Sequence, residues 1–166
     1  MERRLVETIK VSTEIMFHNF YVTLVTCDMD YVLCDLPIWK HCYHTLHSCD
    51  QWYINPLDYE EPPFHEDGLN SLDYLGTKVL SRQELLDYFE KVRSKIMRYL
   101  DSLNDSDLYE NPAGYKHNRL ECIIGHFYAH LGNINATTII ETGKWPRVVG
   151  MSGLEKGLDK NDLYEE

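Results

Sequence analysis

The chain has 166 residues, of which 27 are acidic and 16 are basic, so its formal net charge is −11. This length favours a single domain with a core of its own. The acidic balance argues against binding to nucleic acid or to an anionic membrane surface, because both need clustered lysine and arginine. We see no signal peptide and no run of about 18 apolar residues. We therefore expect a soluble, cytoplasmic protein.

The five cysteines contain no C-x-x-C pair, so neither a redox motif nor a zinc knuckle is visible. Their spacing is unlike that of a disulfide framework. We expect most of them to be small, buried apolar groups.

Two helices are predicted in the first third of the chain. An apolar stripe of helical period covers residues 6–25. Asp35 then offers an N-cap and Pro37 suits a first helical turn, which predicts a second helix over residues 36–53. It should stop before Asn55-Pro56, because the residue before a proline disfavours helix.

A loop of about 25 residues follows, and two further helices are predicted after it. The loop, residues 55–80, is long enough to indicate a functional segment or a long crossover. Ser81 and Glu84 form a capping box for a helix that ends near residue 104. The last helix is expected over residues 118–142, with Gly143 after its end.

These elements predict an all-α fold, a four-helix bundle over residues 1–150 followed by a C-terminal tail over residues 151–166. No strand-like alternation is long enough to build a sheet. The long link between the second and third helices permits them to run parallel, whereas a short link would force them to be antiparallel.

Histidines on the last predicted helix are the first candidates for chemistry. His126 and His130 are four residues apart, so both imidazoles lie on one helical face, as a shared metal ion requires. Phe127 follows His126, so this is not the H-E-x-x-H helix of metalloproteases. The same spacing also arises by chance in core or surface pairs.

The second predicted helix offers three candidates for a third ligand. His41, His44 and His47 each lie three residues apart, so the row drifts around the helix and one ion cannot easily take all three. His44 is central, and we expect the other two to support the ligands from behind, to lie on the surface or to be packing residues. His18 on the first helix competes for the same role.

Three imidazoles are the protein half of a catalytic zinc-type site, with one position left for water or substrate. The same ligands would accept nickel, iron, cobalt or manganese. His65 and His117 lie on predicted loops, and we expect both to face solvent.

Two stretches of the chain resemble the DinB-like superfamily of metal-dependent proteins. The first runs from Leu36 to Trp52, LPIWKHCYHTLHSCDQW, and the second from Gly125 to Asn135, GHFYAHLGNIN. The segment Pro62 to His65 and the capped helix from Ser81 also fall where such chains place similar segments. The resemblance covers roughly residues 5–150.

The resemblance implies a DinB-like (DinB/YfiT-like) four-helix bundle in which His44, His126 and His130 bind one divalent metal ion. We expect this ion to be zinc or nickel first, and iron or manganese next. Asn133 and His47 depart from the usual residues of the family and put the substrate preference in doubt. Members with assigned activities are thiol-dependent transferases and isomerases, and others carry a hydrolase label.

We therefore expect a metal-dependent transferase or hydrolase that acts on a small-molecule substrate, with a low-molecular-weight thiol as cosubstrate in the first case. The loop at 55–80 and the tail from Trp145 are expected to roof the metal, with Tyr59, Phe64 and Trp145 as walls of a small pocket. The alternatives are a non-catalytic metal- or ligand-binding bundle related to stress response and a structural helical protein. We expect a homodimer, the commonest closed assembly.

Overall fold

The computed structural model describes residues 2–124, 127–148, 159 and 161–165. This part of the chain is mostly helical and includes one small two-stranded sheet. In chain order the elements are α1 (Arg4–Thr26), β1 (Val32–Leu33), β2 (Leu36–Pro37), α2 (Ile38–Trp52), α3 (Arg82–Ser102), the 3₁₀ helix η1 (Asp105–Tyr109), α4 (Arg119–Ile124) and α5 (Phe127–Thr142). Among the described residues, no helix combines the length and the apolar character needed to cross a membrane.

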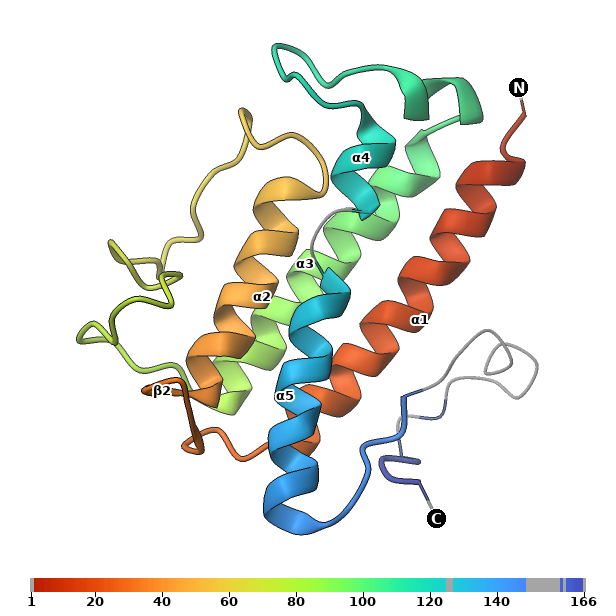
Figure 1. Cartoon of the computed structure of the whole chain (residues 1–166). Coiled ribbons are helices and arrows are strands. Elements are labelled where there is room, and N and C mark those ends of the chain that lie inside the picture. The colour runs from red at the N-terminus through yellow and green to blue at the C-terminus, as the bar shows by residue number, and fades with distance from the viewer. Residues whose placement is uncertain (1, 125–126, 149–158, 160, 166) are drawn as a thin grey trace.

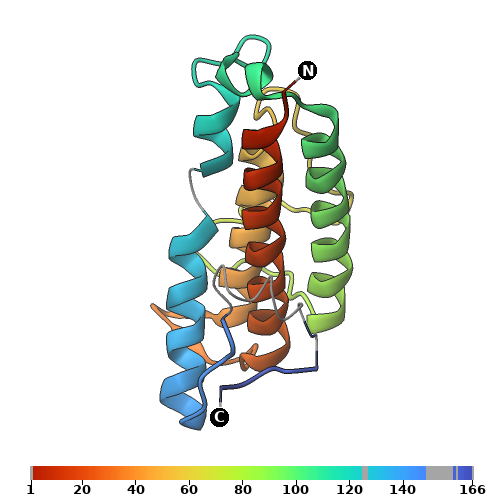
Figure 2. The same ribbon diagram turned by 90° about the vertical axis from the view of Figure 1, so that its right-hand side faces the viewer.

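The longer helices α1, α2, α3 and α5 pack side by side around a common core (Figure 1). Both α1 and α2 contact α3 on one side and α5 on the other. Figure 1 shows α2 and α3 running in the same direction, as the long link between them permits, while α1 and α5 run the opposite way. Figure 2 shows that α4 precedes α5 along the same edge of the molecule.

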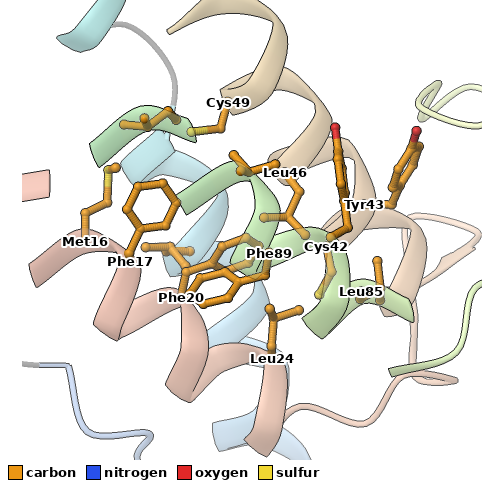
Figure 3. Close-up of a cluster of buried hydrophobic side chains, with 14 of the residues drawn as sticks. Met16, Phe17, Phe20, Leu24, Cys42, Tyr43, Leu46, Cys49, Leu85 and Phe89 are labelled. Carbon is orange, nitrogen blue, oxygen red and sulfur yellow. The ribbon is translucent and has the colours of Figure 1, made fainter. Parts of the chain in front are cut away.

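Aromatic and aliphatic side chains from all four of these helices fill the core. The rings of Phe17 and Phe20 on α1 meet Phe89 on α3 edge to face, with centroids 5.7 and 6.1 Å apart, a favoured aromatic geometry. Leu46 of α2 points into the same cluster (Figure 3) and is fully buried, as Ile134 of α5 very nearly is. Along each helix, apolar side chains such as these recur every three to four residues. This spacing places them on one face of the helix and explains why the sequence forms helices here.

The start of α2 differs from the sequence prediction. Cys34 and Asp35 have φ angles of 51° and 64° and form the two-residue turn between β1 and β2. A tight hairpin turn of this kind needs left-handed backbone at both central positions. Asp35 is therefore not an N-cap. Instead, the first amide of α2, that of Ile38, donates to the carbonyl of Tyr31 at 2.9 Å.

The C-terminal helical region is described in two pieces, α4 and α5, which together cover the range predicted for one helix. Residues 125 and 126, between them, lie outside the described part of the chain. The predicted end is confirmed: Gly143 has a φ of 69° and its amide donates to the carbonyl of Ile139 at 2.9 Å.

The described part of the tail folds back on itself. Pro146 pairs with Tyr164 as an isolated bridge, and Arg147 donates to the Tyr164 carbonyl and forms an ion pair with Asp162. This part of the tail lies on the side of the helices opposite the loop between α2 and α3 (Figures 1 and 2).

The predicted capping box of α3 is present. The Ser81 hydroxyl accepts the Glu84 amide at 3.3 Å, and the Glu84 carboxylate accepts the Ser81 amide at 2.7 Å. Ser81→Ala should lower the free energy of unfolding by about 1 kcal/mol. Ser102→Ala, the same change at the other end of α3, should cost less than about 0.5 kcal/mol. Urea unfolding of both variants tests this, and an equal loss in the two would contradict the cap.

The capping box also predicts a pH dependence. The pKa of Glu84 is lowered because its carboxylate accepts hydrogen bonds from the Ser81 backbone and side chain. The stability from these bonds is complete above the unfolded carboxyl pKa of about 4.3 and is lost as pH falls through the lower folded value. Glu84→Gln should reduce this part of the acid destabilisation in urea titrations between pH 7 and pH 3.

Candidate metal centre

The structure brings together two of the three predicted ligands, His44 on α2 and His130 on α5. Their ring centroids are 4.9 Å apart and the rings are inclined at 70°. Both side chains are half-buried. Two imidazoles bound to one tetrahedral zinc at 2.0–2.1 Å would have centroids roughly 5 Å apart. The observed separation therefore fits a shared ion.

The orientation of His44 is fixed by the loop between α2 and α3. Its Nδ1 lies 2.7 Å from the carbonyl oxygen of Asn70. A carbonyl only accepts, so Nδ1 carries the proton and Nε2 carries the lone pair. A backbone carbonyl that holds the far nitrogen of a histidine is a common feature of metal-binding imidazoles.

The third predicted ligand, His126, lies outside the described residues. Of the alternatives to His44, His41 is buried and its Nε2 lies 2.9 Å from the carbonyl oxygen of Leu33. Its imidazole therefore contacts the hairpin of β1 and β2. His18 is buried in α1.

A buried lysine holds the segment that carries Asn70. Lys40 is 0% exposed, and its Nζ donates to the carbonyls of Gly68, Leu69 and Leu75 at 3.2, 3.0 and 3.1 Å. Gly68 has a φ of 75°, and a Cβ there would overlap the Tyr74 ring. All three protons of the ammonium group are therefore used to fold this part of the loop against α2.

A second group of possible ligands lies where α2 meets the same loop. His47 of α2, Glu61 and His65 each offer one ligand atom, and these atoms lie within 4.8 Å of one another. Glu61 Oε2 is 2.7 Å from His47 Nε2 and 3.5 Å from His65 Nδ1. A set of two imidazoles and a carboxylate is a known zinc ligand set.

Tyrosine and amide groups surround this cluster. The Tyr43 hydroxyl lies 2.7 Å from His65 Nδ1, and the Tyr59 hydroxyl donates to Glu61 at 3.1 Å. Burial lowers the pKa of His47, and the Glu61 carboxylate only partly opposes this, so the imidazole is neutral at pH 7.

The exposed fractions of the His65 and His47 side chains bear on two sequence expectations. The His65 side chain is only 11% exposed, so the expectation of a solvent-facing residue is wrong. His47, predicted as a packing or surface residue, is 1% exposed. Periodicity cannot pair it with His65, because the path of an irregular loop decides that contact. The expectation for His117 is confirmed, since its side chain is 46% exposed.

Asp50, six residues after His44 on α2, contacts two side chains of α3. Its carboxylate accepts the Tyr88 hydroxyl at 2.8 Å and pairs with Lys95 at 2.6 Å. Of the three aromatic residues expected to wall a pocket over the metal, Tyr59 packs on His47 and Phe64 on Tyr43. Trp145 is 59% exposed.

A cavity of about 210 Å³ opens between α1, the residue after α2 and α4, away from the described ligands. Its lining combines apolar side chains with residues that carry a hydroxyl group. Neither His44 nor His130 is part of the described lining. The lining residues are Thr8, Ile9, Ser12, Thr13, Met16, Tyr53 and Ile123.

The cysteines of the described chain are free, as expected, with Cys27, Cys42 and Cys49 buried.

In comparisons with protein-family models, with curated proteins and with solved structures, nothing matches this chain.

Proposed function

We propose that the chain is a divalent-metal-dependent enzyme in which His44, His126 and His130 hold one ion. The observation that carries this proposal is the meeting of His44 and His130, which come from different helices, at a ring separation of 4.9 Å. The Asn70 carbonyl supports it, because it leaves the lone pair of His44 on Nε2. His126 belongs to the proposal through its four-residue spacing from His130.

The fold in this proposal is a four-helix bundle of the DinB-like type. Its support is the packing of α1 and α2 against both α3 and α5. The fourth member of the bundle would comprise α4 and α5, in line along one edge (Figure 2).

The chemistry follows from the ligand set. Three neutral imidazoles leave a bound ion with its full charge and at least one open position, and such an ion lowers the pKa of a water or thiol held next to it. We propose a thiol-dependent transfer or a hydrolysis on a small molecule. The chain contributes by orienting His44 through Asn70 and by holding the loop with Lys40.

The test begins with elemental analysis of the full chain purified without a histidine tag. We expect at least one zinc, nickel, iron or manganese ion per chain, which includes the ion at the His44 centre. Consumption of a low-molecular-weight thiol with an electrophilic substrate, and hydrolysis of small esters and amides, are then measured before and after chelation. Metal-dependent turnover supports the enzyme.

The other outcomes separate the alternatives. Bound metal with no turnover would contradict catalysis and favour a metal-binding or ligand-binding bundle. Protein that neither contains metal nor rebinds zinc or nickel at micromolar levels would contradict the centre itself.

A further inference from the structure

The cluster of His47, Glu61 and His65 is separate from the centre proposed above and shares no ligand with it. His47 lies near the end of α2, and Glu61 and His65 lie on the loop, one on each side of Phe64 and two prolines. We propose that these three side chains form a second binding site for a divalent transition-metal ion, with zinc as the reference ion.

The distances support a shared ion. Ligand atoms around a tetrahedral zinc lie roughly 3.3 Å apart when the bonds are 2.0–2.1 Å long. Glu61 Oε2 lies 2.7 Å from His47 Nε2 and 3.5 Å from His65 Nδ1, which brackets that value. The imidazole rings of His47 and His65 have centroids 5.0 Å apart. Movements of about 1 Å would therefore convert the present contacts into a ligand set.

The burial of the three groups gives the site a closed side and an open side. The side chains of His47 and His65 are 1% and 11% exposed, whereas that of Glu61 is 46% exposed. An ion would enter past the carboxylate, which is the charged ligand and the one nearest to solvent. The Lys95 ammonium, 5.5 Å from the Tyr59 ring, is paired with Asp50 and so does not neutralise Glu61.

The groups around His47 and His65 can rearrange their hydrogen bonds as metal binding requires. His47 Nε2 faces a carboxylate, so it carries the proton, and Nδ1 faces the Asn70 amide at 3.4 Å. To bind through Nε2, the neutral ring must move its proton to Nδ1. The Asn70 amide can then turn its oxygen toward Nδ1, because an asparagine side chain both donates and accepts. The Tyr43 hydroxyl, 2.7 Å from His65 Nδ1, must rotate away.

Asn70 consequently lies between the two centres. Its carbonyl holds His44 and its side chain faces His47. The second site does not depend on the first, because its ligands and their contacts are complete without His44.

The experiment is a calorimetric titration of metal-free, full-length protein with zinc chloride. His65→Gln should remove one bound equivalent. Glu61→Gln should weaken the affinity for the same zinc equivalent by at least roughly 10–100-fold, which is the cost of losing a residue that only supports a ligand. This change keeps the side-chain size and an oxygen that accepts from Tyr59, so the loop should remain folded, which circular dichroism and urea unfolding verify.

A matched control lies elsewhere in the chain. His117 and Glu121 also lie four residues apart, with 3.5 Å between Nδ1 and Oε2, but on an exposed surface. His117→Gln should leave both equivalents unchanged. If the equivalent lost in His65→Gln persists in His44→Ala, the second site stands even where the first fails. Zinc binding unchanged by both His65→Gln and Glu61→Gln would overturn the proposal and leave the cluster as a contact that holds the loop.

Discussion

Replacing His44 with alanine should weaken zinc binding at the proposed His44, His126 and His130 centre by at least about 100-fold, since a ligand loss exceeds the loss of an outer partner. His130→Ala should do the same, because the two rings lie 4.9 Å apart. Only two imidazoles would then remain, and the ion would lose the geometry of the site. The measurement is metal content by elemental analysis together with zinc affinity by calorimetry.

The matched control for this prediction is His41→Ala. It removes the same side chain from α2 one turn earlier, where the imidazole contacts the Leu33 carbonyl. Its zinc affinity should stay within a few-fold of the original. If His44→Ala retains zinc at this centre while His41→Ala or His18→Ala loses it, the assignment of His44 as a ligand is wrong.

Lys40→Met should lower the free energy of unfolding by about 2–4 kcal/mol, because it leaves buried carbonyls without a donor. The methionine side chain extends as far as the lysine Cε and replaces its apolar stem, so packing is largely retained. Three carbonyls would lose their partner, those of Gly68, Leu69 and Leu75. Urea unfolding gives the stability, and limited proteolysis of the loop reports its release from α2.

Lys10→Met is the control for this second prediction. Lys10 pairs with Asp101 on the surface, with side chains 26% and 56% exposed, and such pairs contribute about 0–1 kcal/mol. Equal losses in the two variants would contradict a special role for Lys40. The Lys40 variant should also bind zinc more weakly at His44, because Leu69 precedes the residue whose carbonyl holds that ring.

The resemblance to DinB-like proteins and the homodimer remain predictions. Light scattering of the full chain at micromolar concentration tests the dimer, and a mass near the 19.6 kDa of one chain would contradict it.

The sequence by itself determined the elements with strong local signals. The capping box at Ser81 fixes the start of α3 through hydrogen bonds between near neighbours, and Gly143 ends α5 because its φ of 69° favours glycine. Apolar residues of helical period predicted the longer helices, since each must bury one face. The i, i+4 histidine pair is likewise a local property.

Tertiary structure decided what depends on the path of the chain. Asp35 looked like an N-cap, but pairing of β1 with β2 places it in a hairpin turn. His65 looked exposed, but Lys40 and Tyr43 draw its loop onto α2. Among three histidines on one helix, only the packing of α5 against α2 brought His44 to His130. Local spacing places side chains on a helical face, whereas contacts between distant segments follow from how buried surfaces and buried polar groups are satisfied together.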